Sequence, residues 1–350
     1  MHKKKILFIS NHSRKFTGFG KNLKNILTYL YKTGKYELVE AANGVVKGDT
    51  NADTSPWKVI GTLPSDPQRL EQLNKDPTLA QKASYGHETI DDIMEEEKPD
   101  IFVGIEDYWA FSGFSKKPWW NKINCMIWTT LDSIPIFGEA VKDAKNIKHF
   151  YSWASFGANE LQKIGHNHVK HLRGSISDGE YYKLEGGEIL DIRSRFKIND
   201  SFIIGFVFRN QLRKTVPSLL DALKEINKAR PDNKIKVLLH TNWKEGWDIK
   251  SLMAERGIPD NQILTTYVCN KCKDYSISPF VGHDINCPAC RADKSVNTVN
   301  IAQGVFDYQL NEVYNIMNMY VHPFTSGGQE IPIQEAMLTE TPSACTNYSC

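Results

Sequence analysis

The sequence lacks any long hydrophobic run. Of its 350 residues, 41% are hydrophobic and 24% are charged, and its apolar stretches are much shorter than the roughly 20 residues that cross a bilayer. The N-terminus, MHKKKILFIS, has a basic cluster but only a short apolar run and no small-residue cleavage site after it, which is not the pattern of a secretory signal peptide. These absences predict a soluble, cytoplasmic globular protein without a transmembrane segment.

The sequence also has little net charge. Its 43 Lys and Arg residues exceed its 41 Asp and Glu residues by only two, which gives no chain-wide electrostatic basis for binding nucleic acid. We therefore do not predict a nucleic-acid partner. The chain has neither an internal repeat of fixed period nor a low-complexity tract.

Cysteine is scarce outside one short segment. Four of the seven cysteines form two Cys-x2-Cys pairs separated by 14 residues, a spacing typical of zinc ribbons, in which two tight turns supply four thiolates to one tetrahedral Zn²⁺. The alternative is four reduced cysteines without a metal, but polar neighbours such as NKCKD and CPACR offer no core in which to bury them. The predicted ligands of a structural Zn²⁺ are Cys269, Cys272, Cys287 and Cys290.

Strand-like and helix-like segments alternate along the first half of the chain. The apolar run KKKILFIS predicts a buried strand, the glycine-containing NHSRKFTGFG a loop, and FGKNLKNILTYLYK a helix with apolar residues on one face. Alternation of this kind predicts a parallel sheet covered by helices on both faces. Further strands are predicted at YELVEAA, WKVIG, DIFVGI, CMIWTTL and HFYSWA, and helices at HETIDDIMEEEK and SFGANELQKIG.

A second β/α series begins at FIIGFVF. The polar segment SDGEYYKLEGGEILDIRSRFKINDS precedes it, and we interpret that segment as a linker. The predicted fold class is therefore α/β with two Rossmann-like domains, residues 1–185 and 186–350, and a zinc-ribbon insertion at residues 268–296 in the second domain. The later predicted strands are KIKVLLHT, QILTTYV and MYVHPF, and the helices are VPSLLDALKEINKA, DIKSLMAERG, DYQLNEVYNIM and IPIQEAMLTE.

Two segments of the second half have charged residues between a strand and a helix. In GFVFRNQLRKTVPSLL, Arg209 follows a strand and Lys214 comes five residues later, before a helix, and GGQEIPIQEAMLTETP contains Pro332 and Glu335. These two motifs resemble those of the nucleotide-sugar domain of GT-B glycosyltransferases, in particular the retaining glycosyltransferase family 4, whose second motif is EGFGLPxxEAMAxGxP. Gly327 stands where the family has its first glutamate, and Glu330 lies three residues further on.

Weaker resemblances extend over the first half. TGFGKN is similar to the glycine loop of the acceptor domain, and TTLDSIP is similar to TxHDxxP with Leu131 in place of the histidine. The resemblance implies that Gly18 and Gly20 form a phosphate or sugar loop and that Asp132 lies on the acceptor side. Turn geometry and capping account for these residue types equally well.

The resemblance implies a nucleotide-diphosphate sugar donor. Negative charge grows on its diphosphate as the glycosidic bond breaks, so Arg209 and Lys214 would stabilise the transition state. The loop and helix start that follow would bind an anion with backbone N–H groups, and Glu335 would accept hydrogen bonds from the ribose hydroxyls. No catalytic metal and no protein nucleophile are implied, because the family is thought to act with retention without either. The remaining candidate donor-binding residues are Gly328, Gln329, Glu330 and Ile331.

Two functions follow from these patterns. The first is a glycosyltransferase with an unidentified acceptor: a glycan, a lipid-linked sugar or a protein. The second is a catalytically degraded GT-B protein whose zinc ribbon binds a protein or nucleic-acid partner, which Gly327 favours. The ribbon carries Lys271 and Lys273 against Asp274 and Asp284, which is a poor track for phosphates.

The family pattern also concerns the C-terminal end. In the family, the helix of the second motif leads into another strand, a glycine-containing loop with a further acidic residue, and several closing helices. The sequence ends in SACTNYSC, within that strand. We therefore expect the second domain to be truncated.

Overall fold

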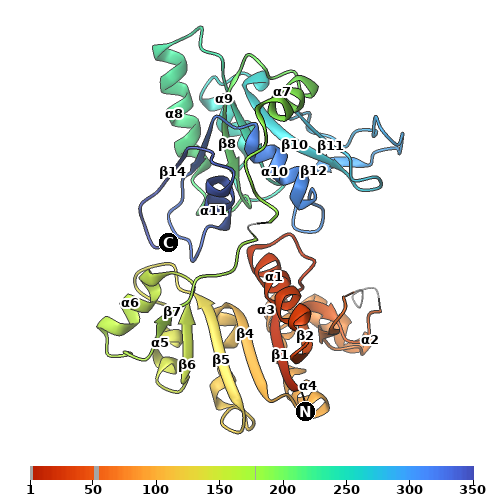
Figure 1. The fold of residues 1–350 in the computed structure, drawn as a ribbon, viewed down its shortest axis with the longest axis vertical. Helices are drawn as coiled ribbons and strands as arrows, with labels where there is room; N and C mark the ends of the chain where they lie inside the picture. The colour runs from red at the N-terminus through yellow and green to blue at the C-terminus, as the bar shows by residue number, and fades with distance from the viewer. Residues whose placement is uncertain (1–2, 51–54, 178) are drawn as a thin grey trace. The chain divides into compact units, whose positions relative to one another are not determined.

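A computed structural model describes residues 3–50, 55–177 and 179–350. The chain divides into two compact units, each built around one sheet that is wholly or mainly parallel (Figure 1). The first unit comprises Met1–Ser175 with Gly327–Gln329 and Ser349–Cys350, and the second comprises Ile176–Ser326 with Glu330–Tyr348. The predicted α/β class with two parallel-sheet domains is confirmed.

The sheet of the first unit has the strand order β3-β2-β1-β4-β5-β6-β7, and all of its neighbouring strands are parallel. Its strands are β1 (Lys4–Asn11), β2 (Tyr36–Val46), β3 (Lys58–Leu63), β4 (Ile101–Asp107), β5 (Asn124–Thr130), β6 (His149–Ser152) and β7 (Lys170–His171). Its helices are α1 (Gly18–Thr33), α2 (Pro67–Lys75), α3 (Pro77–Ser84), α4 (Ile90–Glu97), α5 (Gly138–Ala144) and α6 (Ser155–Lys163), with short 3-10 turns η1 (Tyr108–Phe111) and η2 (Phe114–Lys116).

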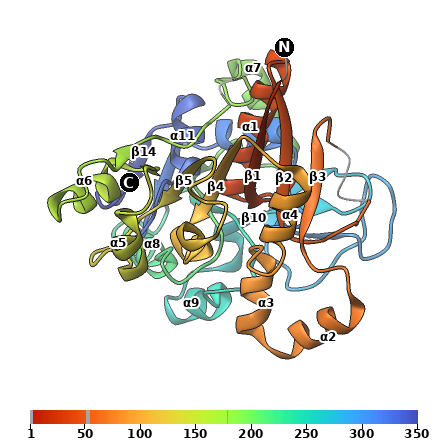
Figure 2. The ribbon, with the colours of Figure 1, turned by 90° about the horizontal axis from the view of Figure 1, so that it is seen from below.

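Local signals fix the helix ends in this unit. Thr17 caps α1 by accepting a hydrogen bond from the Gly20 N–H, and Gly34 ends that helix with a φ of 65°. α2 and α3, which the sequence analysis did not predict, each begin with an aspartate cap followed by proline. α3 lies against β2 and β3 (Figure 2).

The sheet of the second unit has the order β11-β10-β9-β8-β13-β14, and β12 also pairs with β10. β11 and β12 are antiparallel to β10, while the other neighbours are parallel. Its strands are β8 (Phe202–Val207), β9 (Ile235–His240), β10 (Ile263–Cys269), β11 (Tyr275–Pro279), β12 (Val296–Thr298), β13 (Met319–His322) and β14 (Ser343–Cys345). Its helices are α7 (Gly186–Arg195), α8 (Val216–Ala229), α9 (Ile249–Glu255), α10 (Asp307–Asn315) and α11 (Ile331–Leu338), with the 3-10 turn η3 (Asp260–Gln262).

The segment that the sequence analysis interpreted as a linker contains α7, so that interpretation is corrected for residues 186–195. Glu185 and Glu188 form a capping box at its start. Near its end, the buried Arg193 donates hydrogen bonds to the carbonyl oxygens of Ile316 at 2.6 Å and Ile198 at 3.0 Å. These bonds fasten α7 to the second unit, which a hydrophobic pattern does not reveal.

Within the part of the chain that the structure describes, no helix is both long enough and apolar enough to cross a membrane.

Candidate functional site

The site of the second unit lies where the strand order changes direction. From β8 the chain proceeds to β9 on one side of the sheet, while β13 pairs with β8 on the other side. The loops after β8 and β13 therefore leave adjacent strands in different directions, and such a point in a parallel sheet is where ligands bind. These two loops carry most of the predicted donor-binding residues.

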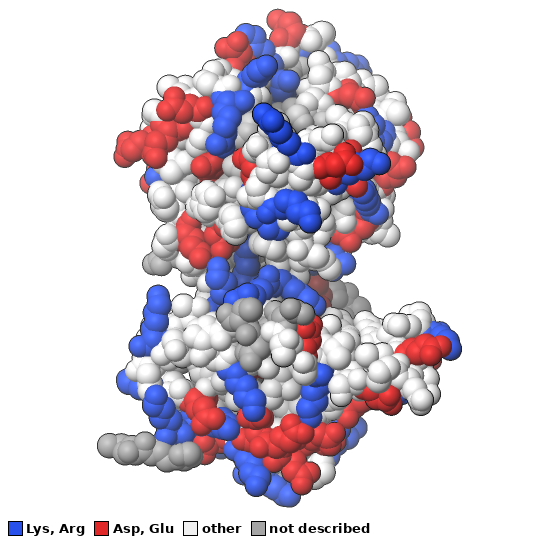
Figure 3. All heavy atoms as spheres, turned by 90° about the vertical axis from the view of Figure 1, so that its right-hand side faces the viewer, with Lys and Arg blue, Asp and Glu red and all other residues white. Residues whose placement is uncertain are grey.

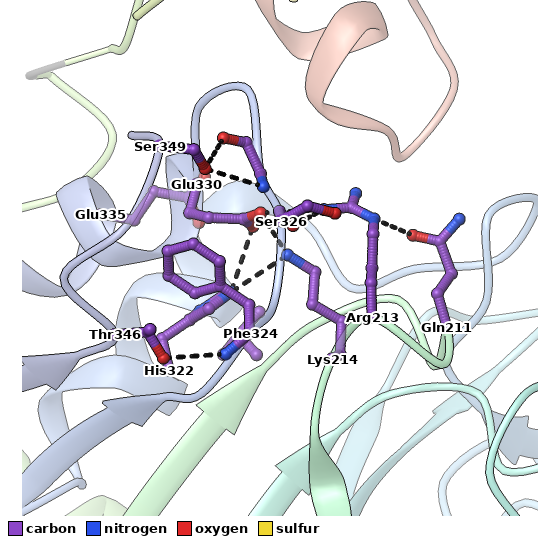
Figure 4. A network of polar contacts seen from close by, with 12 residues as sticks. Gln211, Arg213, Lys214, His322, Phe324, Ser326, Glu330, Glu335, Thr346 and Ser349 are labelled. Carbon is purple, nitrogen blue, oxygen red and sulfur yellow. Dashed lines mark hydrogen bonds and ion pairs between the residues drawn. The ribbon is translucent and has the colours of Figure 1, made fainter. Parts of the chain in front are cut away.

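A buried carboxylate, Glu330, joins the two loops (Figure 4). Its Oε1 forms ion pairs with Lys214 Nζ and, at 3.1 Å, with Arg213 Nη1. Its Oε2 lies 3.1 Å from His322 Nε2, and His322 Nδ1 lies 2.6 Å from the Tyr320 hydroxyl. The Lys214 side chain is only 3% exposed and that of Glu330 only 8%, so this is an interior network.

Electrostatics keep Glu330 charged in this setting. Burial alone would raise the pKa of Glu330, but the His322 hydrogen bond and the charges of Lys214 and Arg213 hold that pKa well below its usual range. Burial lowers the pKa of His322, and the two cations lower it further against the opposing effect of Glu330. At neutral pH the cluster therefore contains two cations, one anion and a neutral imidazole.

Further contacts join the two loops and attach the loop after β8 to Trp247, which follows β9. The Thr325 N–H donates to the Arg213 carbonyl at 2.9 Å, and Arg213 Nη1 donates to the Ser326 carbonyl at 2.6 Å. Trp247 Nε1 donates to the Lys214 carbonyl at 2.9 Å. The Phe324 ring centroid lies 5.5 Å from Lys214 Nζ, within cation–π range.

The other two predicted charged residues lie outside this network. The Arg209 side chain is half-exposed, and its Nε lies 3.5 Å from Glu245 Oε1. Glu335 is buried in α11, where the Tyr314 hydroxyl donates to Glu335 Oε2 at 2.7 Å. The structure thus unites Lys214 and Glu330 but leaves Arg209 on the surface of its loop.

The remaining predicted donor-binding residues come directly before α11 in the sequence or begin it. Gly328 and Gln329 lie in the loop between β13 and α11 and group with the first unit, whereas Ile331, the buried first residue of α11, belongs to the second. No side chain caps the start of α11. Pro332 has no N–H group, however, and the Ile333 N–H donates to the Glu330 carbonyl at 3.1 Å, so the first turn of α11 offers an anion little beyond the Ile331 N–H. Gly327, at the position of the family's first glutamate, exchanges backbone hydrogen bonds with the Ser349 hydroxyl.

Sequence analysis missed Arg213 and His322. Arg213 directly precedes Lys214, so a pair of adjacent cations was the available signal. His322 lies at the end of the predicted strand MYVHPF, and nothing in that stretch indicates that its ring faces Lys214.

The glycine loop of the first unit is shaped by its own backbone. A Cβ on Gly20 would lie 2.6 Å from the Lys15 carbonyl oxygen and 2.8 Å from that of His12. Gly18, the first residue of α1, is exposed. Chain geometry therefore accounts for Gly20. Of the two glycines, Gly18 is the one exposed to solvent and to a ligand.

Polar residues follow adjacent strands of the first sheet. Asp132, half-buried, follows β5. Asn11 at the end of β1 donates a hydrogen bond to the buried Glu106 in β4, and burial followed by the charge of Asp107 raises the pKa of Glu106 well above its usual value. The sequence analysis did not select Glu106. Polar residues are common where strands end, so the two acidic residues that close DIFVGIED gave no sign that one of them is buried.

The four paired cysteines converge. Their Sγ atoms all lie within 4.8 Å of one another, with Cys269 3.7 Å from Cys290 and Cys272 3.6 Å from Cys287. Disulfide sulfurs lie about 2 Å apart, so these cysteines are unbridged. Four sulfurs at the usual Zn–S length of about 2.3 Å form a tetrahedron with edges of about 3.8 Å. The geometry is compatible with a metal site.

The two cysteine turns have the same backbone form. In each turn, the residue four positions after the first cysteine has a positive φ, 63° at Lys273 and 61° at Arg291. Its N–H donates to the carbonyl of that first cysteine, at 3.1 Å in one turn and 2.9 Å in the other. The loops that bear these turns extend from the ends of β10, β11 and β12 (Figure 1).

Solved structures share the fold of the whole chain. Sucrose-phosphate synthase from Thermosynechococcus elongatus has a TM-score of 0.66 and 13% identity, with 99% of this chain and 82% of that chain covered. HepE from Anabaena, solved with UDP and glucose, has a TM-score of 0.63 and 13% identity, with 99% and 81% covered. WaaG, a glycosyltransferase involved in lipopolysaccharide biosynthesis, has a TM-score of 0.62 and 11% identity, with 98% and 81% covered.

These likenesses define the architecture as the GT-B fold of glycosyltransferases, with a cysteine cluster in the second domain. No protein-family model and no curated protein sequence matches the chain.

The glycine loop yields a stability prediction. Gly20→Ala should lower the free energy of unfolding by about 1–3 kcal/mol, because the added methyl group meets two backbone oxygens that cannot rotate away. Gly18→Ala is the matched control and should be neutral or slightly stabilising, since alanine favours a helical position. Urea denaturation of both variants measures the difference, and equal stabilities would show that the loop accommodates a side chain at either position.

Proposed function

We propose that the protein is a glycosyltransferase that moves a sugar from a nucleotide-diphosphate donor to an acceptor hydroxyl. The observation that carries this proposal is the pair of cations, Arg213 and Lys214, placed at the switch point of the second sheet next to the start of α11. A fold match to glycosyltransferases solved with UDP or UDP-glucose supports it. The sequence resemblance to family 4 points to the same chemistry.

The cations would act on the donor's leaving group. As the bond between the sugar and the diphosphate breaks, negative charge collects on the phosphate oxygens, and nearby fixed cations lower the barrier at that moment. Lys214 and Arg213 are held in place by Glu330, and the half-exposed Arg209 can turn from Glu245 to a bound diphosphate. At the start of α11, the Ile331 N–H would bind a phosphate oxygen, since Pro332 has no N–H and Ile333 donates to the Glu330 carbonyl.

Retention of configuration is part of the proposal and rests on the family resemblance. The acceptor hydroxyl would attack the donor carbon on the face from which the diphosphate leaves, and its proton would pass to the leaving phosphate. No protein nucleophile and no catalytic metal take part. Glu335 would bind the ribose hydroxyls after its bond to Tyr314 is rearranged.

The acceptor would bind to the first unit. The proposed acceptor-side residues are Gly18 and Asp132. Gly20 shapes the connection from β1 to α1 that carries Gly18. A glycan, a lipid-linked sugar or a protein remain the acceptor classes that we propose, since fold does not fix substrate.

We also propose that Cys269, Cys272, Cys287 and Cys290 hold one structural Zn²⁺. The tetrahedral spacing of the sulfurs and the matched turns support this ligand set. Zn²⁺ would supply folding energy to a segment too small to bury a core of its own.

A second candidate function is a binding module with a catalytically degraded GT-B body. Gly327 favours it, because the glutamate of the family motif is missing there. On the face shown in Figure 3, however, Lys and Arg are interspersed with Asp and Glu over the second unit, which gives no continuous basic surface for nucleic acid in that view. Donor binding separates the two functions.

The donor site can be tested with nucleotide ligands. A panel of nucleotide sugars and diphosphates should raise the melting temperature of the protein, since a ligand at a hundred times its Kd adds about 2.7 kcal/mol. Lys214→Ala and Arg209→Ala should each weaken binding of the selected nucleotide by more than about tenfold, the scale of a lost charge-assisted contact. Unchanged affinity in both variants, measured by calorimetry, would contradict the proposed donor site.

Glu335 has its own test. Glu335→Gln should reduce affinity for a nucleoside diphosphate while inorganic pyrophosphate binds almost as before, because only the nucleotide has a ribose. Glutamine can still accept a hydrogen bond from Tyr314, so the fold should persist. Equal losses for the two ligands would instead assign Glu335 a structural role.

The metal proposal predicts one zinc per chain in protein purified without chelator, measured by elemental analysis. Cys287→Ser should lower the zinc content and destabilise the ribbon, because one thiolate is lost from a closed four-ligand site. Cys125→Ser is the control, since Cys125 lies apart from the cluster in the first unit. Folded protein of this sequence that contains no zinc would refute the site.

A further inference from the structure

His322 is a fully buried histidine whose two ring nitrogens contact different partners. Nδ1 lies 2.6 Å from the Tyr320 hydroxyl, and Nε2 lies 3.1 Å from Glu330 Oε2. The ring packs edge-on against Phe206 and Phe324, with centroids 5.0 and 5.7 Å away. Its position is therefore fixed on all sides.

Counting protons assigns the direction of these bonds. The Tyr320 hydroxyl has one proton and two acceptors within reach, the Val207 carbonyl at 3.1 Å and His322 Nδ1 at 2.6 Å. The Glu330 carboxylate can only accept, so a neutral His322 carries its proton on Nε2, donates it to Glu330 Oε2 and accepts from the Tyr320 hydroxyl at Nδ1. The Lys214 ammonium, 3.4 Å from the same Nε2, then has Glu330 Oε1 as its acceptor.

The two oxygens of Glu330 thus have separate partners. Oε2 is occupied by His322, and Oε1 receives Lys214 and Arg213. A carboxylate with one oxygen fixed in this way cannot rotate, so the other oxygen stays turned toward the cations. Both cations belong to the loop that follows β8, whereas His322 and Glu330 belong to β13 and its loop.

We propose that His322 is a positioning residue for the donor site, which acts through Glu330 to hold Lys214 and Arg213 where a diphosphate can meet them. This inference rests on the proposed function in so far as the diphosphate belongs to a sugar donor. The role requires an N–H group at the place of Nε2, and it does not require an imidazole as such.

Two amide variants of His322 distinguish the effect of that N–H group from the effect of packing alone. In His322→Gln the side-chain amide reaches the place of Nε2 and still donates to Glu330, and Tyr320 can turn its proton to Val207. In His322→Asn the shorter amide oxygen reaches only the place of Nδ1, so it accepts from Tyr320 but leaves Glu330 without that donor. The Asn variant should bind inorganic pyrophosphate and UDP about tenfold more weakly than the wild type, and the Gln variant should stay within about threefold of it.

A second measurement needs no nucleotide. Reductive methylation of the full chain, followed by mass spectrometry, reports how accessible the Lys214 amine is. Lys214 should be protected in the wild type and in His322→Gln, and modified about tenfold faster in His322→Asn. Glu330→Gln should likewise release Lys214 and weaken pyrophosphate binding, and it provides the test if His322→Asn does not fold.

The outcomes separate the two claims. Wild-type protein that binds neither ligand would refute the donor site, and the methylation rates would still decide the role of His322. Wild-type affinity and protection in His322→Asn, or equal losses in the Asn and Gln variants, would overturn the positioning role. Tighter pyrophosphate binding by Glu330→Gln would also overturn it, because Glu330 would then compete with the phosphate for Lys214.

Discussion

The site of the second unit depends on one buried ion cluster, centred on the carboxylate of Glu330. Removing a carboxylate or an ammonium from water costs several kcal/mol per ion, and this cost is offset only where the partners are close and fully hydrogen-bonded. Here the partners come from the loop after β8 and from β13. The cluster therefore forms only when both loops are in place, and the pairing of β8 with β13 brings their loops together.

The same cluster gives a physical meaning to the altered motif. The loop before α11 has no carboxylate at Gly327, yet it has one at Glu330, where the side chain turns inward to Lys214. The loop therefore keeps an acidic residue whose charge is used to orient protein cations. The cluster retains a net charge of about +1 when His322 is neutral, and in the function that we propose this residual positive charge faces the diphosphate of the donor.

How much of this was predictable depends on how local each feature is. The β/α alternation was evident because strands buried on both faces are continuously apolar, as in FIIGFVF, and the cysteine cluster was evident because its spacing alone defines two turns. α7 was missed because its attachment is a buried Arg193 bonded to carbonyl oxygens. The contact of Lys214 with His322 joins residues more than a hundred positions apart, and it follows only from the pairing of β8 with β13, which no local pattern contains.

The cysteine-bearing segment is integrated into the sheet. β11 covers the outer edge of β10, which would otherwise expose unpaired backbone groups. The Tyr275 hydroxyl in β11 contacts Arg195 of α7 at 2.7 Å and also bonds Glu312 of α10, and Gln309 of α10 donates to the Lys273 carbonyl at 3.0 Å.

These hydrogen bonds connect the first cysteine turn and β11 to α10. α10 is the helix that comes directly before β13. β13 ends at His322, which contacts Glu330. A metal that stiffens the cysteine turns would thus brace the strand that carries His322, whereas a detached docking module would need none of these contacts. The way in which the cysteine-bearing segment is attached favours a brace for the sheet over a separate binding element.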